Sequence, residues 1–284
     1  MKPEVLEMPG ISGSIAALGF GNPANPPILA LHGWLDNAAS FIPLAGFLEK
    51  YYLVAMDFAG HGYSQHRPSG TKYHLVDYVA DVAHVSEKLG WEQFYLLGHS
   101  LGAGVSILFA AVYPERIRKM ILIDGVGPIS GAADTAIDRL RKSIDAGVKQ
   151  AFGQESSPKI YNDWQKLIDA RCAASPVSLQ SAELLVRRNA TEYKHGIVLH
   201  SDRRLRHPSP LYLSEDMVLY FIGQVSAPTL ILLAKKGMVI HRKQTAKRGA
   251  TFRNALVSEC DGQHHLHMDN PAAIATQINA FLQR

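Results

Sequence analysis

The chain has 284 residues, of which 47% are hydrophobic and 19% are charged, and its formal net charge is +4. This length and apolar content suffice for a sizeable core and fit one large α/β domain with an insertion, or two domains. The basic clusters, such as residues 203–206, are short and carry no interleaved aromatic residues. We therefore expect solvated surface and no nucleic-acid partner, the alternative being an electropositive entrance for anionic substrates.

No apolar run approaches the length of about 20 residues needed to span a bilayer. The start of the chain, residues 1–7, lacks the apolar block of a signal peptide. These two features predict a cytoplasmic protein without a membrane span. The cysteines, Cys172 and Cys260, stand in no C-x-x-C or metal-ligand spacing, which predicts two reduced thiols.

Short apolar runs that end at polar or glycine-rich loops predict buried parallel strands in the first half of the chain. The strands are expected over residues 27–31, 52–56, 94–97 and 119–123, and the helices between them over 40–50, 73–90 and 101–112. The last of these strands ends at Asp124. The alternation of strand and helix predicts the α/β class.

The alternation breaks between residues 127 and 215, where helices such as 135–148 and 178–189 are predicted without a central strand. It resumes with strands near 228–233 and 255–257, a helix near 241–248 and a closing helix. We therefore expect residues 1–126 and 216–284 to form a mostly parallel, doubly wound sheet with its helices. Residues 127–215 are expected to form a helical cap, inserted after the strand ending at Asp124, over the carboxyl ends of the strands.

The sequence Gly98-His99-Ser100-Leu101-Gly102 is a G-x-S-x-G pattern between a predicted strand and a predicted helix, as in a nucleophile elbow. A serine is exposed on such a turn only if the residues two before and two after it carry no bulk. Ser100 is therefore the predicted nucleophile. The backbone N–H groups of Leu101 and Trp34, the latter in the loop after the first strand, are the predicted oxyanion hole.

A serine hydroxyl needs a general base within hydrogen-bond reach. Three histidines, His264, His265 and His267, follow the last predicted strand, and His264 is nearest the loop glycine Gly262. The residues alone leave the choice among them open. Metal binding by the trio is an alternative, but no acidic partner stands at helical metal spacing, so we expect no metal and no cofactor. His99 and His61 are interpreted as structural or pocket-lining.

Over nearly its whole length this pattern resembles the α/β-hydrolase fold superfamily. The matching signatures are residues 32–34, 57–64, 98–102 and 262–267. Within the superfamily, residues 31–37 and 201–205 look like the serine hydrolase-like proteins. The resemblance implies Ser100 as nucleophile and His264 as base, because the G-G-H ending of such proteins falls on Gly262-Gln263-His264.

The acid of the implied triad departs from the common pattern. Many relatives carry an aspartate just beyond the strand equivalent to residues 229–233, but residues 234–239 here contain no carboxylate. Some members take the acid from the end of the preceding strand, where this chain has Asp124. We predict that Asp124 is the acid, with simple capping of its loop as the alternative. Asp57 is predicted to structure the loop at 60–64.

These features predict a serine hydrolase that cleaves an ester, thioester or lactone of a small-molecule acyl substrate through an acyl-enzyme. A serine at the elbow argues against dehalogenase or epoxide-hydrolase chemistry, which needs a carboxylate nucleophile. Two alternatives remain: a non-catalytic ligand-binding or sensor protein, and a C–C hydrolase or lyase with the same triad. The aromatic residues Tyr161, Trp164 and Tyr193 either line an acyl pocket or pack the cap helices.

Overall fold

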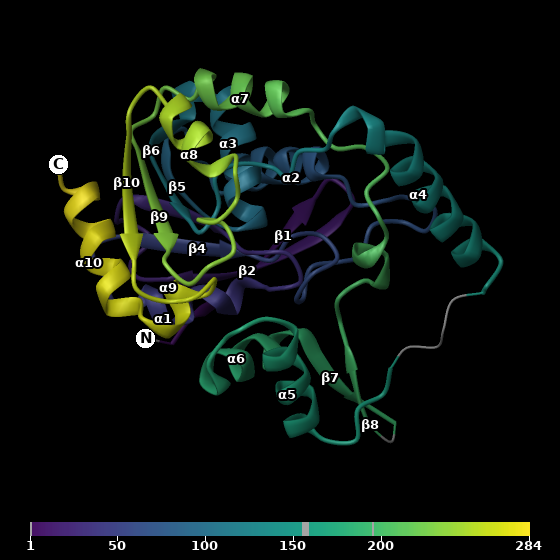
Figure 1. Cartoon of the computed structure of the whole chain (residues 1–284). Coiled ribbons are helices and arrows are strands. Elements are labelled where there is room, and N and C mark those ends of the chain that lie inside the picture. Colours follow the sequence, from purple (N-terminus) through teal and green to yellow (C-terminus); the bar gives the residue numbers. More distant parts are fainter. Residues whose placement is uncertain (1, 155–158, 195) are drawn as a thin grey trace.

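A twisted sheet of eight strands forms the centre of the computed structural model, which describes residues 2–154, 159–194 and 196–284 (Figure 1). The strand order is β1-β2-β4-β3-β5-β6-β9-β10. The six strands from β4 to β10 in this order run parallel, and β2 and β1 continue the sheet antiparallel at one edge. The predicted fold class, a mostly parallel sheet with helices on both faces, is confirmed.

The strands have the following bounds: β1 (Glu4–Gly10), β2 (Gly13–Phe20), β3 (Pro27–Leu31), β4 (Tyr52–Met56), β5 (Phe94–His99), β6 (Ile117–Ile123), β9 (Thr229–Ala234) and β10 (Ala255–Cys260). The sequence predicted β3 and β4 residue for residue, and placed β5, β6, β9 and β10 correctly. It missed the N-terminal hairpin of β1 and β2. Only one residue of β1, Met8, is buried, so that edge strand carries almost no hydrophobic alternation.

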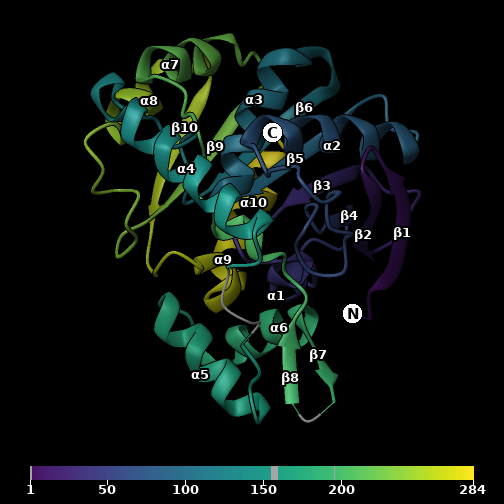
Figure 2. The same ribbon diagram turned by 90° about the vertical axis from the view of Figure 1, so that its right-hand side faces the viewer.

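Helices cover both faces of the sheet (Figures 1 and 2). One face carries α2 (Leu75–Lys88), α3 (Leu101–Val112), α7 (Glu215–Gln224) and α8 (Thr245–Thr251), and the other carries α1 (Ile42–Ala45), α9 (Leu266–Asp269) and α10 (Pro271–Leu282). Successive residues of each parallel strand point to opposite faces. Thus Val54 lies in one buried cluster and Leu53 in the other. This double burial explains why the strands read as continuous apolar runs.

The helix predicted over residues 40–50 is wrong in extent. A 3-10 turn (Ala38–Phe41) precedes α1, which is only four residues long and has Pro43 in its first turn. Gly46 follows directly after α1, and glycine destabilises a helix interior by roughly 1 kcal/mol relative to alanine. Phe41, Leu44 and Leu48 of this segment are nevertheless buried, whereas Phe47 is exposed.

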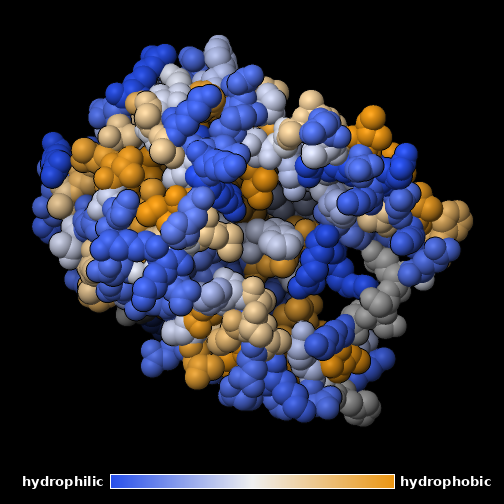
Figure 3. Space-filling view, in the orientation of Figure 1, coloured by the Kyte–Doolittle hydropathy of each residue, from blue (hydrophilic) through white to orange (hydrophobic). Residues whose placement is uncertain are grey.

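Residues 127–215 follow β6 and extend to the first residue of α7, Glu215, and we call this segment the insertion. Residues 155–158 and 195 of it lie outside the described part. It contains α4 (Ala136–Ala151), α5 (Trp164–Ala174) and α6 (Leu179–Asn189), and also a hairpin of β7 (Ala190–Tyr193) and β8 (Gly196–Leu199) that the sequence did not predict. Figures 1 and 2 place α5, α6 and the hairpin together, with α4 apart from them. Hydrophobic and hydrophilic side chains are interspersed over the face of the molecule seen in Figure 3.

None of the helices in the described ranges is both long and apolar enough to cross a membrane.

Candidate active site

Ser100 stands on a strained turn between β5 and α3. Its φ is 52° and its ψ is −109°, a backbone conformation that side chains disfavour. A Cβ atom at Gly98 would lie 2.5 Å from the carbonyl oxygen of Gly102, and one at Gly102 would collide with the carbonyl oxygen of Leu31. The two glycines of the G-x-S-x-G pattern are therefore required by close backbone approach, as the sequence predicted.

Three side chains from distant parts of the chain form a continuous hydrogen-bonded line. Nε2 of His264 lies 3.0 Å from the hydroxyl oxygen of Ser100, and Nδ1 of His264 lies 2.6 Å from Oδ2 of Asp124. A carboxylate only accepts hydrogen bonds, so Nδ1 carries the proton and the Nε2 lone pair faces the serine hydroxyl. The structure thus brings together the three residues that the sequence singled out as nucleophile, base and acid.

The acid position is built from two neighbouring strands. Asp124 follows β6 directly and is fully buried, and its Oδ1 accepts a hydrogen bond of 3.1 Å from the backbone N–H of Ala234, the last residue of β9. In the loop after β9, a Cβ atom at Gly237 would lie only 2.6 Å from Oδ2 of Asp124. The loop after β9 thus leaves room for the carboxylate of the adjacent strand.

The two predicted oxyanion donors lie at the same edge of the sheet. Leu101 is the first residue of α3, where helix N–H groups have no partner within the helix. Trp34 lies in the loop after β3, which pairs with β5, and this loop is tied to α3 by a hydrogen bond of 3.1 Å from the N–H of Gly102 to the carbonyl of His32. Within the described ranges neither backbone N–H donates a hydrogen bond.

The other two histidines of the C-terminal loop have different surroundings from His264. Nε2 of His265 lies 3.0 Å from Oδ2 of Asp36, and His267 is fully buried against Phe41. Burial, together with the neighbouring His265, lowers the pKa of His267 to about 3, so this ring is neutral. Of the three histidines, only His264 contacts the serine hydroxyl in the described structure.

His99 and His61 are buried, as their structural interpretation requires. His99 donates from Nε2 to the carbonyl oxygen of His264 at 2.9 Å, so it supports the loop that carries the candidate base. His61 packs against Phe58 and Tyr78, and burial lowers its pKa to about 3. Neither ring contacts Ser100.

Asp57 holds the loop that follows β4, as predicted, and has a second role that the sequence did not reveal. It accepts hydrogen bonds from the backbone N–H groups of Tyr63 at 2.9 Å and Ala38 at 2.7 Å. It also forms a buried ion pair of 2.8 Å with Arg188 of α6. This pair joins the insertion to the sheet core over a separation of 131 positions in sequence, and no local pattern signals it.

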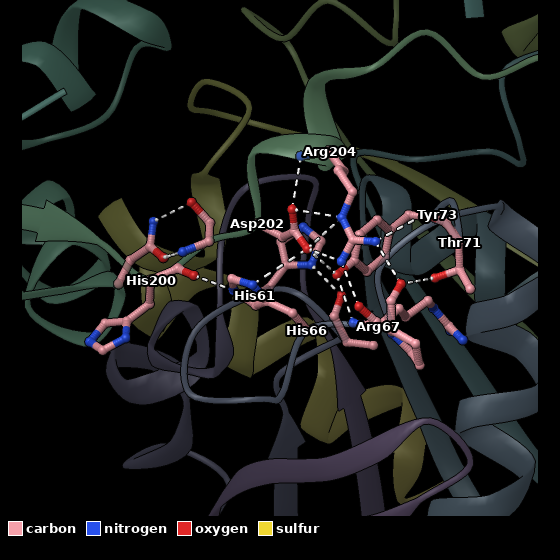
Figure 4. A network of polar contacts seen from close by, with 12 residues as sticks. His61, His66, Arg67, Thr71, Tyr73, His200, Asp202 and Arg204 are labelled. Atoms are coloured by element: carbon pink, nitrogen blue, oxygen red, sulfur yellow. Dashed lines mark hydrogen bonds and ion pairs between the residues drawn. The ribbon is translucent and has the colours of Figure 1, made fainter. Parts of the chain in front are cut away.

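The segment 201–205, which carries part of the family resemblance, is a structural anchor (Figure 4). Asp202 accepts a hydrogen bond of 2.7 Å from the hydroxyl of Tyr73 and pairs with Arg204. Arg204 in turn donates to the carbonyl oxygens of Pro68 and Thr71 at 2.8 and 3.0 Å. These bonds fix the end of the insertion to the loop at 67–73 of the core.

The aromatic residues of the insertion favour the packing interpretation. Tyr161 and Trp164 pack against the small hydrophobic cluster that α5, α6 and β8 bury among themselves. Arg187 lies 4.4 Å from the centroid of the Trp164 ring, and Tyr193 is half exposed.

The family model described as alpha/beta hydrolase fold matches residues 26–271. A serine hydrolase-like protein of Danio rerio is 34% identical over 97% of this chain and 87% of the relative. The crystal structure of a hypothetical protein from Pseudomonas aeruginosa PAO1 superposes with a TM-score of 0.92 and 39% identity, covering both chains fully. The thioesterase domain from the curacin biosynthetic pathway has a TM-score of 0.86, covering 98% of this chain and 100% of that domain at 23% identity, a likeness of fold.

Proposed function

The chain belongs to the alpha/beta hydrolase fold family, and from that premise we propose that it is a serine hydrolase acting on an ester, thioester or lactone. One observation carries the proposal: the unbroken line from the Ser100 hydroxyl through His264 to Asp124, with contacts of 3.0 and 2.6 Å. A hydroxyl at this distance from an imidazole lone pair is in position to lose its proton as it attacks.

In the proposed mechanism His264 takes the proton of Ser100 while the serine oxygen bonds to the carbonyl carbon of the substrate. The backbone N–H groups of Trp34 and Leu101 stabilise the oxyanion of the tetrahedral intermediate. Protonated His264 then gives its proton to the leaving group, and the acyl-enzyme forms. His264 next activates a water molecule, which releases the acid and frees Ser100. Asp124 keeps the His264 ring oriented and stabilises its charged form throughout.

We further propose that two parts of the chain divide catalysis and substrate selection between them. Residues 1–126 and 216–284 act as the catalytic core, and residues 127–215 as the cap that determines which acyl groups enter. The group of α5, α6 and the hairpin buries a small hydrophobic cluster of its own, which includes Leu167, Val186 and Ile197 and supports this division. The thioesterase named among the structural neighbours makes thioesters a substrate class to test first, beside esters and lactones.

A sensor protein on the same scaffold is the alternative that the sequence raised on account of the missing acid. Asp124 lies 2.6 Å from His264 and can act as the acid, so the argument for a sensor protein no longer applies. A C–C hydrolase or lyase would use the same line of residues, so only substrates distinguish it from an esterase.

Labelling with a fluorophosphonate probe tests the proposal. We expect one equivalent to be incorporated into the wild-type protein and none into Ser100→Ala, while Ser69→Ala, a change at an exposed loop serine, labels normally. Folded wild-type protein that does not react would contradict a serine hydrolase. Turnover of p-nitrophenyl esters, acyl thioesters and lactones then identifies the class, and cleavage of carbon acids without ester turnover would instead indicate C–C chemistry.

A further inference from the structure

A second buried polar cluster lies beside the candidate active site and is not used in the proposed mechanism. It consists of Asp36 in the loop after β3, His99 at the end of β5, and His265 at the start of α9. All three side chains are buried, and one ligand atom of each lies within 4.8 Å of the others. Arg171 of α5 contacts the cluster from the insertion side.

Nδ1 of His99 is a buried lone pair without a partner. Nε2 of the same ring faces the carbonyl oxygen of His264 at 2.9 Å, and a carbonyl only accepts, so Nε2 carries the proton. Burial lowers the pKa of His99 well below its usual value, and the neighbouring histidines lower it further, so the ring is neutral. Nδ1 is therefore unprotonated, fully buried and without a hydrogen bond in the described structure.

This lone pair faces an ionised carboxylate. The guanidinium of Arg171 pairs with Oδ1 of Asp36 at 2.7 Å, as an ionised carboxylate requires. Oδ2 of Asp36 lies 3.8 Å from Nδ1 of His99. Two electron-rich atoms that face each other in a buried site repel, and a cation between them removes the repulsion.

His265 adds a second mismatch. Its Nε2 lies 3.0 Å from Oδ2 of Asp36 and 3.1 Å from the guanidinium of Arg171. The carboxylate requires a proton on that nitrogen and the guanidinium requires a lone pair, so one tautomer does not satisfy both. A metal ion in place of Arg171 would accept the Nε2 lone pair.

Two of the three distances between the ligand atoms bracket the value expected for a tetrahedral ion. Two ligand atoms about 2.1 Å from Zn²⁺ lie ~3.4 Å apart in a tetrahedron, and the observed 3.0 and 3.8 Å lie on either side of this value. The side of the cluster at Gly33 has no side chain: a Cβ atom there would lie 2.9 Å from Oδ2 of Asp36 and 3.0 Å from Nδ1 of His99.

We propose that Asp36, His99 and His265 form a binding site for a divalent transition metal ion of the Zn²⁺ or Co²⁺ class, and that the ion and Arg171 exclude each other. Two imidazoles and a carboxylate are a donor set that suits such ions. Arg171 supplies the positive charge when no metal is bound, and its side chain is partly exposed, so it has room to leave. The site is distinct from the Ser100–His264–Asp124 line and does not depend on hydrolase activity.

Cobalt binding tests the site directly, because tetrahedral Co²⁺ with nitrogen and oxygen ligands has intense visible absorption bands. Chelator-treated protein is titrated with Co²⁺, with equilibrium dialysis as an independent count of bound ions. We expect one ion per chain with tetrahedral bands. The variants Asp36→Asn, which conserves the shape of the side chain, and His265→Gln should bind it about 10- to 100-fold more weakly, the range seen even for changes to outer-shell groups.

Arg171→Gln provides a variant that gains affinity, so the test does not depend on variants that simply fail to fold. Removal of the competing charge should tighten binding about tenfold or more. Arg187→Gln, at a half-exposed arginine of α6 outside the cluster, is the matched control and should bind like the wild type. The exposed His241→Gln should also bind normally. Equal affinity of Arg171→Gln and wild type, or binding that survives Asp36→Asn, would assign the ion to surface histidines and refute the site.

Discussion

The substitution Asp124→Asn tests the acid of the candidate triad, which follows β6 and not β9. The structure predicts how the new amide orients, because Oδ1 of Asp124 accepts the N–H of Ala234 at 3.1 Å. An asparagine keeps that bond by placing its carbonyl oxygen there, which turns its NH₂ group toward Nδ1 of His264. That nitrogen must then be the acceptor, so the proton moves to Nε2, which no longer accepts from Ser100.

The wrong tautomer is the reason that the corresponding change in a serine protease lowers kcat by about 10⁴. We expect a loss between about 10² and 10⁴ in kcat on a short p-nitrophenyl ester, equal to roughly 3 to 5 kcal/mol of transition-state stabilisation. The assay measures kcat and KM together with the melting temperature. Asp261→Asn, an exposed aspartate in the loop before His264, is the matched control and should keep its activity.

Capping of the loop is the alternative role of Asp124, and it predicts the opposite pair of results. Asparagine can still cap the loop, so Asp124→Asn would keep an activity close to that of the wild type. Asp124→Ala would remove the cap and lower the melting temperature. Near-normal turnover of a folded Asp124→Asn protein would therefore refute the tautomer argument and remove Asp124 from the mechanism.

Three further predictions follow from other contacts. Gly237→Ala should lower kcat at least about tenfold with KM little changed, because the new Cβ lies 2.6 Å from Oδ2 of Asp124 and displaces it; unchanged kinetics would contradict the steric argument. Arg188→Met leaves the buried Asp57 unpaired and should lower the free energy of unfolding by about 3–5 kcal/mol in urea denaturation. His61 has a pKa lowered from 6.5 to about 3, so only the unfolded chain takes up its proton between these values. Stability is therefore lost as pH falls below 6.5, by about 2 kcal/mol at pH 5, and His61→Leu should remove this part of the difference between pH 8 and pH 5.

The sequence was most informative where the chemistry is local. The elbow was predictable because Gly98, Ser100 and Gly102 act through a single turn between β5 and α3. Asp124 was predictable because a residue that directly follows a buried strand lies at the carboxyl edge of the sheet, whatever the rest of the fold. The buried strands were predictable because both of their faces are apolar.

Contacts between distant segments left no such signal. The cluster of Asp36, His99 and His265 joins residues up to 229 positions apart. The sequence argument against a metal considered only acids at helical spacing from the histidines, whereas the structure supplies Asp36 from the loop after β3. The hairpin β7–β8 was missed for a related reason: each of its strands is four residues long and has a single buried residue, so neither carries a clear alternation.

The insertion and the core share one electrostatic arrangement. Asp36 and Asp57 follow the neighbouring parallel strands β3 and β4, both carboxylates are buried, and each pairs with an arginine of the insertion, Arg171 and Arg188 respectively. A buried carboxylate without its partner is strongly destabilising. The core therefore needs the insertion for its charge balance, beyond any role as a cover for the substrate. The two pairs differ in one respect: Arg188 is enclosed, whereas Arg171 is partly exposed beside two imidazoles. Of the two arginines, only Arg171 lies beside side chains that could bind a metal ion in its place.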